Sequence, residues 1–169
     1  MYKIRIQGNA DLYGEIDVSG SKNAALPILV SSLLSKNDLT LKNIPELEDI
    51  KSMIELLEGY GVSCRQNNGN IILNAEKIKN NTADYDLVRK MRASILILGP
   101  LLARFKKANI SLPGGCAIGT RPIDIHLDSL SKLGVKFNIE NGFVKAFVEK
   151  DMIGNQIDLS FPSVGATEN

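Results

Sequence analysis

The chain repeats itself with a period of about 70 residues. Asp17, Asp86 and Asp158 stand 69 and 72 residues apart, each in a short segment where the aspartate is followed by an apolar residue. After the first two aspartates the same order of patterns follows: an apolar helical run, a short strand, an amphipathic helix and a hairpin. A period of this length exceeds that of short solenoid repeats and indicates units that each contain helices and a small sheet.

The two copies predict matching elements. Helical spacing ends at Gly61 and at Gly134, which are typical helix stops before a strand. Asn-Gly pairs at 68–69 and 141–142 lie between strand-like runs and predict hairpins. The paired elements that we expect are helices at 23–34 and 92–103, strands at 39–41 and 110–112, helices at 50–58 and 123–132, and second hairpin arms at 71–73 and 143–148.

We expect an α/β (α+β) fold in which the helices pack inside and the sheets lie outside. The runs at 23–34 and 92–103 are apolar on most faces, as buried helices are. Each unit should begin with a strand, at 14–19, around Asp86, and at 156–160. The alternation of residues 1–8 also predicts a strand.

A third unit begins and is not completed. Residues 163–167 occupy the position that residues 21–25 hold in the first unit. A helix should follow, but the sequence ends at Asn169, so we expect a fragment of a longer protein. The predicted units are therefore 14–84, 85–154, and a truncated third from 155.

One connection differs between the copies and is the candidate functional loop. Residues 113–122 hold three glycines, two prolines and Cys116, five residues before Arg121. Glycines let backbone N–H groups approach a ligand closely, and a thiol near cations is a candidate reactive group. A symmetric scaffold with one longer connection suggests that function resides there. Glycine-rich loops also form ordinary turns. Cys116 by itself is therefore compatible with a reactive thiol and with a residue of an ordinary turn.

Composition excludes several classes of protein. A formal net charge of +1 argues against a nucleic-acid partner, which would need a clustered basic excess. The longest apolar run is interrupted by Gly99 and Pro100, so no membrane span or signal peptide is predicted. Cys64 and Cys116 form no disulfide framework and no zinc spacing, which suits a reducing cytoplasm. We expect no metal and no cofactor.

Four segments resemble a known family: residues 20–27, 91–94, 113–122 followed by Asp124 and His126, and 163–167. They occur in the order found in UDP-N-acetylglucosamine 1-carboxyvinyltransferases, the enolpyruvyl transferases of peptidoglycan synthesis. The resemblance is to the amino-terminal part of that family and covers the whole chain. It implies two domains, each of three units around buried helices. Residues 1–21 would then be the first strands of the second domain, and residues 22–169 an incomplete first domain.

The resemblance also implies substrates and site residues. The family transfers the enolpyruvyl group of phosphoenolpyruvate to the 3-hydroxyl of UDP-N-acetylglucosamine, and Cys116 matches its catalytic cysteine. The family's base, an aspartate, has no counterpart here, so the isolated chain is expected to be inactive. The positions that match phosphoenolpyruvate contacts are Lys22, Asn23 and Arg121. Those that match nucleotide-sugar contacts are Asn23, Arg92, Arg121, Pro122, Ile123, Asp124, Ile125, Ser163, Val164 and Gly165, with His126 as a further candidate near the phosphates.

Plainer interpretations stay open for single residues. Lys22 could be a solvated surface lysine, and Asn23 a helix cap in competition with Ser21. Arg92 could form a structural ion pair, and His126 could be a partly buried structural histidine. Two other functions also remain: a shikimate-pathway enolpyruvyl transferase, and a binding module that holds a UDP-sugar without turnover.

Overall fold

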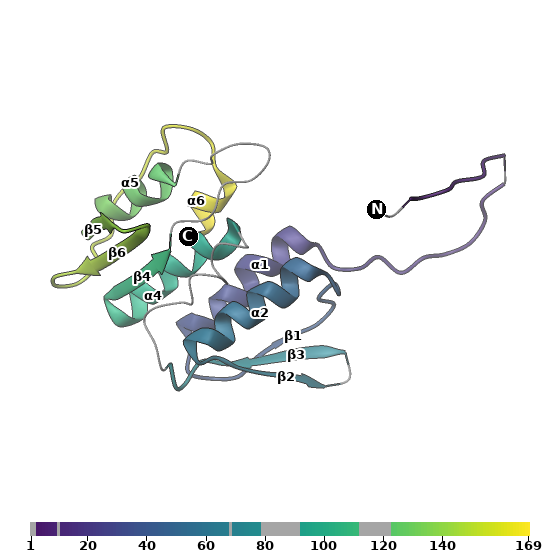
Figure 1. The fold of residues 1–169 in the computed structure, drawn as a ribbon, viewed down its shortest axis with the longest axis horizontal. Helices are drawn as coiled ribbons and strands as arrows, with labels where there is room; N and C mark the ends of the chain where they lie inside the picture. Colours follow the sequence, from purple (N-terminus) through teal and green to yellow (C-terminus); the bar gives the residue numbers. More distant parts are fainter. Residues whose placement is uncertain (1–2, 10, 68, 79–91, 112–122) are drawn as a thin grey trace.

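The computed structural model describes residues 3–9, 11–67, 69–78, 92–111 and 123–169 (Figure 1). Its elements in the first unit are α1 (Lys22–Ser31), η1 (Ser32–Leu34), β1 (Leu39–Leu41), α2 (Glu48–Tyr60), β2 (Ser63–Asn67) and β3 (Asn70–Asn74). Those that follow are η2 (Arg92–Ile97), α4 (Leu98–Phe105), β4 (Lys107–Ser111), α5 (Asp124–Lys132), β5 (Val135–Glu140), β6 (Phe143–Val148) and α6 (Val164–Glu168).

The described residues form two antiparallel sheets with the same strand order. The first sheet runs β1-β3-β2 and the second β4-β6-β5, so the hairpin's second arm is central in both. Leu41 pairs with Ile71 in the first sheet, and Ser111 pairs with Phe143 in the second. The repetition of about 70 residues is therefore confirmed as a repetition of topology.

Glycines end the amphipathic helices as predicted. Gly61 caps α2 at φ 103°, a left-handed conformation in which its N–H donates to the Glu58 carbonyl at 2.8 Å. Gly134 follows α5 at φ 92°. The second hairpin turns at Asn141 and Gly142, which both have positive φ, the conformation that matches the twist of the two flanking strands.

Helices of both units share one core between the two sheets. α1 packs on α2 and on η2, and α4 packs on η1 and β4 (Figure 1). Leu29, Leu33 and Met53 of the first unit and Leu98 and Leu101 of the second are fully buried. The expected arrangement of central helices and outer sheets is present, although Ile28 and Leu34 remain exposed at 44% and 56%.

The segment around 92–103 begins as a 3-10 helix rather than as the α-helix that was predicted. Pro100 stands in the first turn of α4, where its missing N–H costs least. Because proline in the middle of one long α-helix would remove a hydrogen bond, a change of helix type just before it accommodates this residue.

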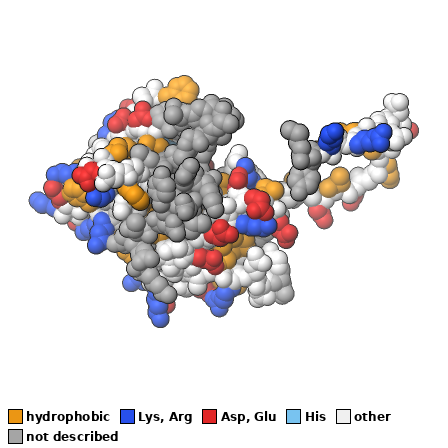
Figure 2. Space-filling model, in the orientation of Figure 1, with side chains coloured by type: hydrophobic (Ala, Val, Ile, Leu, Met, Phe, Trp, Pro, Cys, Tyr) orange, Lys and Arg blue, Asp and Glu red, His pale blue; other side chains and the backbone are white. Residues whose placement is uncertain are grey.

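The strands predicted at 14–19 and 156–160 are wrong for this structure, and residues 3–8 form no strand either. Residues 3–9 and 11–19 instead extend away from the body, with Ile16 and Val18 exposed at 91% and 87% (Figures 1 and 2). Alternating sequence forms a strand only where a neighbouring strand supplies backbone hydrogen bonds, and the described residues pair no strand with these segments. The counterpart at Asp86 lies outside the described residues.

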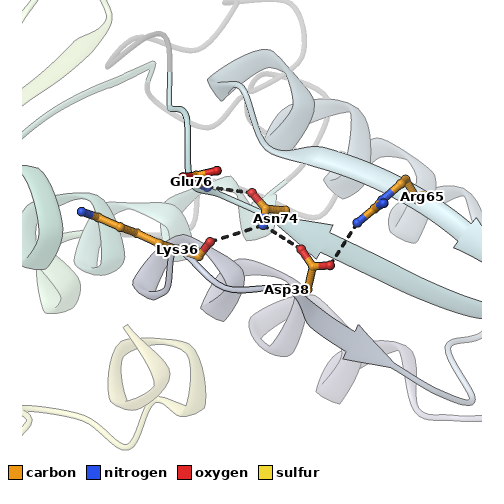
Figure 3. A network of polar contacts seen from close by, with 5 residues as sticks. All are labelled: Lys36, Asp38, Arg65, Asn74 and Glu76. Atoms are coloured by element: carbon orange, nitrogen blue, oxygen red, sulfur yellow. Dashed lines mark hydrogen bonds and ion pairs between the residues drawn. The ribbon is translucent and has the colours of Figure 1, made fainter.

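A polar network lies at one end of the first sheet, where β1 begins and β3 ends (Figure 3). Asn74 Nδ2 donates to Asp38 Oδ1 at 2.7 Å and to the Lys36 carbonyl at 3.3 Å, and the Glu76 N–H donates to Asn74 Oδ1. Arg65 on β2 donates to the other oxygen of Asp38 at 3.0 Å. The network links the segment before β1 to the end of β3.

Candidate functional site

The start of α1 carries two of the predicted residues. Ser21 caps the helix, and its Oγ accepts a hydrogen bond from the Ala24 N–H at 3.4 Å. Lys22 Nζ lies 2.6 Å from Asp49 Oδ2 at the start of α2, and both side chains are about half exposed. Asn23 is exposed. The alternative that Asn23 caps the helix is therefore wrong, and Lys22 is a paired rather than a free cation.

The residue before this cap is held by close packing. A Cβ on Gly20 would overlap the carbonyl of Asn43, and the Gly20 N–H donates to Asn43 Oδ1 at 3.1 Å. Asn43 itself has a φ of 55°. The loop between β1 and α2 therefore fixes the direction in which the chain enters α1.

α6 begins in the same way as α1. Ser163 is its N-cap and accepts a hydrogen bond from the Ala166 N–H at 3.2 Å, as Ser21 does in the first unit. Val164 is 76% exposed, and Gly165 is half-buried. Two equivalent positions of the repeat, at α1 and α6, thus begin a helix with a serine cap.

The first turn of α5 supplies four further predicted residues. Ile123 and Ile125 are half-buried, Asp124 is exposed, and His126 is 9% exposed. Burial lowers the pKa of His126 below its ordinary value, so the ring is neutral at pH 7. His126 is buried as the plainer interpretation expected, but its ring lies against α6.

α5, α6 and η2 meet at one end of the helical core (Figure 1). An ideal Cβ on Gly165 would lie 3.6 Å from His126 Cε1, so the imidazole faces the first turn of α6. The Asn169 side chain contacts His126 and also the η2–α4 segment. The structure thus brings together the predicted residues at 123–126 and 163–165.

The other predicted residues are not joined to this group by any contact that the structure describes. α1 packs on η2, which places Lys22 and Asn23 on a neighbouring element, without a described hydrogen bond to α5 or α6. Arg92 begins η2, and its side chain lies outside the described residues, as do Cys116, Arg121 and Pro122.

Sequence reasoning missed Asp49 and Asn169. Both are ordinary helix residues in the sequence, Asp49 in the first turn of α2 and Asn169 directly after α6. Only the folded chain shows that each contacts a predicted site residue. Asp49 follows the loop between β1 and α2, which occupies the same place in the first unit as the cysteine loop in the second. This position in the repeat was the signal that could have pointed to Asp49.

A small cavity lies beside α5. Its volume is about 290 Å³, and it is bordered by Ile125, Ser129 and Lys132 on the helix and by Asp158 and Ser160 on the segment before α6. Lys132 Nζ donates to the Asp158 carbonyl at 3.4 Å across it. The cavity has both apolar and hydrogen-bonding walls, and it adjoins the predicted residue Ile125.

Cys64 on β2 is half-buried. Burial raises the pKa of its thiol above the ordinary value, and the Glu58 carboxylate acts in the same direction. A thiol that keeps its proton at neutral pH is a poor nucleophile. Cys64 is therefore a packing residue at the edge of the core.

Within the described ranges, no cluster of three metal-ligating side chains occurs. In that same part of the chain, every helix is too short or too polar to cross a bilayer.

Comparison with known proteins identifies the family. The family model described as EPSP synthase (3-phosphoshikimate 1-carboxyvinyltransferase) matches residues 6–169. The chain belongs to the EPSP synthase family. Its curated relatives include UDP-N-acetylglucosamine 1-carboxyvinyltransferases from Pelagibacter ubique, 53% identical over 169 residues, and from Helicobacter pylori, 49% identical over 167 residues. The chain spans 40% of the length of each, while 100% and 98% of the chain are covered.

Two solved structures share the fold. The enolpyruvyl transferase NikO from Streptomyces tendae superposes with a TM-score of 0.70 at 18% identity, covering 83% of this chain and 31% of that one. EPSP synthase from Acinetobacter baumannii gives 0.68 at 17% identity, covering 92% and 36%. The expected α/β architecture is confirmed.

Proposed function

We propose that the protein transfers the enolpyruvyl group of phosphoenolpyruvate to the 3-hydroxyl of UDP-N-acetylglucosamine, the first committed step of peptidoglycan synthesis. One observation carries the proposal. Relatives that are 46–53% identical over 98% or more of the chain share the name UDP-N-acetylglucosamine 1-carboxyvinyltransferase. Because the chain spans 40% of their length, it would supply one part of the complete active site.

The reaction requires groups that the candidate site can provide in part. A proton must reach the methylene carbon of the enol while the hydroxyl loses its proton and adds to the neighbouring carbon, and the same methyl carbon must then lose a proton as phosphate leaves, which restores the double bond. In this proposal Cys116 acts as the acid, and Arg121 and Lys22 bind the anionic groups of phosphoenolpyruvate. Arginine offers a planar fork for an oxyanion, whereas lysine offers a compact charge.

The nucleotide-sugar would bind where α5 and α6 meet. Residues 123–126 and 163–165 come from segments about 40 positions apart in the sequence, yet His126 lies against Gly165. Backbone N–H groups at the start of α6 suit a diphosphate, because the amino end of a helix favours negative charge. The neighbouring cavity of about 290 Å³ offers Ser129 and Ser160 as hydrogen-bonding walls.

Lys22 would exchange partners when phosphoenolpyruvate binds. In the structure its ammonium group lies 2.6 Å from Asp49. An ion pair between half-exposed side chains contributes little to stability, so a substrate carboxylate or phosphate can replace it at small cost. Asp49 would thus keep the ammonium group at the start of α1 until the substrate arrives.

A second candidate is a shikimate-pathway enolpyruvyl transferase. It is favoured by the description of the family model and by the fold shared with EPSP synthase from Acinetobacter baumannii. The identity to that enzyme is 17%, against 53% to the Pelagibacter ubique relative, so we place the shikimate acceptor second. A third candidate is a module that binds a UDP-sugar without turnover.

Phosphate release and ligand binding separate the three candidates when both are measured on this chain joined to the remaining part that its full-length relatives contain. Release from phosphoenolpyruvate that depends on UDP-N-acetylglucosamine supports the proposal. Release that depends on shikimate 3-phosphate supports the second candidate. Binding of UDP-N-acetylglucosamine without release, measured by calorimetry, supports the binding module. Absence of both binding and release contradicts all three.

A further inference from the structure

The side chain of Asn169 lies among groups from two other elements. Its Oδ1 accepts a hydrogen bond from the Gly99 N–H at 2.8 Å, and its Nδ2 donates to the Ile95 carbonyl at 3.2 Å. Nδ2 also lies 3.0 Å from Nδ1 of His126. Ile95 and Gly99 are four residues apart, where η2 passes into α4. The amide therefore links the two backbone groups that a regular α-helix joins directly.

The two backbone groups fix which way the amide points. An N–H group only donates and a carbonyl oxygen only accepts, so the Asn169 oxygen faces Gly99 and the NH2 group faces Ile95. The NH2 group is also the one that lies against His126. Its two hydrogens are then both engaged, one by the Ile95 carbonyl and the other by the imidazole.

The contact with His126 determines where the ring carries its proton. Nδ1 faces a donor, so it must offer its lone pair, and in a neutral imidazole the hydrogen is then on Nε2. A protonated ring would place an N–H group against the NH2 group of Asn169. The contact therefore disfavours the charged form, and burial, which lowers the pKa of His126, acts in the same direction.

We infer that Asn169 is a positioning residue that holds His126 as the neutral Nε2–H tautomer, with this N–H on the ring edge that faces α6. An ideal Cβ on Gly165 would lie 3.8 Å from Nε2 and 3.6 Å from Cε1, which identifies that edge. A neutral ring with one oriented donor recognises an acceptor oxygen. The identity of this acceptor rests on the proposed function, under which it is an oxygen of the nucleotide-sugar.

Gly99 is part of the same arrangement. A Cβ at this position would overlap the backbone carbonyl of Asn169 and would also lie 2.7 Å from Oδ1. A side chain on residue 99 would therefore push Asn169 away from both the helix and the imidazole. Substitution of Gly99 tests the inference without altering Asn169 or His126.

The primary experiment measures the ¹⁵N shifts of the His126 ring in the 169-residue chain, where it is the only histidine. Long-range ¹H–¹⁵N spectra at neutral pH distinguish a nitrogen with a lone pair from one with a hydrogen. We expect a lone-pair shift at Nδ1 and an N–H shift at Nε2. The reverse assignment, or the averaged shifts of a freely exchanging ring, overturns the inference.

Two variants and a control add a second readout. Asn169→Asp replaces the donor by an acceptor, so we expect Nδ1 to gain the hydrogen, and we expect Gly99→Ala to give averaged shifts. Asn155→Asp is the matched control, because Asn155 donates to the Lys132 carbonyl at the other end of α5, and its shifts should equal those of the wild type. Wild-type ring shifts in folded Asn169→Asp contradict the inference. If a variant does not fold, the wild-type spectrum alone decides.

Addition of UDP-N-acetylglucosamine separates the inference from the proposed function. A change at Nε2 that leaves Nδ1 in place supports both. A fixed tautomer with no response to the ligand supports the positioning role of Asn169 and contradicts the assigned acceptor.

Discussion

At the scale of single residues, the two cysteines differ in the environment that their neighbours create. Cys64 lies on β2, half-buried, and burial raises its pKa. Cys116 lies outside the described residues, in a loop of glycines and prolines five positions before Arg121. A cation favours the thiolate, so the sequence predicts a lowered pKa for Cys116, opposite to the direction that the structure gives for Cys64.

We therefore predict selective alkylation of Cys116. Fosfomycin, an epoxide that mimics phosphoenolpyruvate, should label Cys116 at neutral pH, because only a thiolate attacks rapidly. Cys64 should remain unlabelled until the pH rises above the ordinary thiol range, since its raised pKa keeps the proton in place. Mass mapping of the adduct provides the measurement, on this chain joined to the remaining part that its full-length relatives contain, with Cys64→Ala as the control. Preferential labelling of Cys64 at neutral pH contradicts both assignments.

Gly20 is the residue whose substitution should most affect the entry into α1. Gly20→Ala places a Cβ into the Asn43 carbonyl, so the backbone must shift, at a cost of about 1–3 kcal/mol. Gly154→Ala is the matched control, because nothing lies within 4 Å of its Cβ position. Thermal melting of both variants measures the difference. Equal melting temperatures would show that the β1–α2 loop does not hold this residue.

At the scale of elements, the pattern of the sequence predicted what depends on local chemistry. The helices ending near Gly61 and Gly134 and the turn at Asn141 and Gly142 formed as expected, because these residues favour left-handed backbone conformations. The strands at 14–19 and 156–160 were wrong, since a strand also needs a partner that the described residues do not supply. Periodicity reports which face is apolar, not whether a neighbour is present.

The candidate site was predictable only in part, for the same reason. Residue types and motif order pointed to His126 and Gly165, which the structure places together. Asn169 could not be found, because its contacts join residues 43 to 74 positions away in the sequence. The predicted roles of Cys116 and Arg121 stay predictions.

Arg104 links the two repeat units and gives a prediction at this scale. Its guanidinium donates to the carbonyls of Leu33 and Ser35, which η1 would otherwise leave without partners, and lies 5.0 Å from the Phe105 ring. Arg104→Ala should cost about 1–3 kcal/mol of unfolding free energy, because hydrogen bonds from a charged group are lost. Denaturant unfolding measures this loss.

The control for Arg104 is Lys107→Ala, which removes an exposed cation from β4 and should change stability by less than about 0.5 kcal/mol. Arg104→Lys should fall between the two, since an ammonium lacks the planar fork. Equal stability of Arg104→Ala and Lys107→Ala would show that the contact between the units is unimportant.

At the scale of the whole molecule, the body and the amino-terminal segment are physically distinct. The body buries a shared core, whereas Ile4, Leu12 and Tyr13 are 89%, 95% and 106% exposed (Figure 2). The visible face of the segment carries both apolar and basic side chains. The prediction that residues 1–21 belong to a second domain agrees with this exposure and remains a prediction.

Deletion of residues 1–19 should leave the body intact. Residues 3–9 and 11–19 are exposed throughout, so we expect the unfolding free energy to change by less than about 0.5 kcal/mol. The melting temperature would then move by no more than about 2 °C. Calorimetry of the shortened and the complete chain makes the comparison. A larger decrease would show that the segment packs on the body.

The measurement that tests the central claim most directly is amide hydrogen exchange of the chain with and without UDP-N-acetylglucosamine. The claim is that the start of α6 and the first turn of α5 form one nucleotide-sugar site. It predicts added protection in peptides that cover residues 123–126 and 163–165, with little change in β2 and β5. Protection confined to the sheets, or no ligand-dependent protection at either segment, would contradict it.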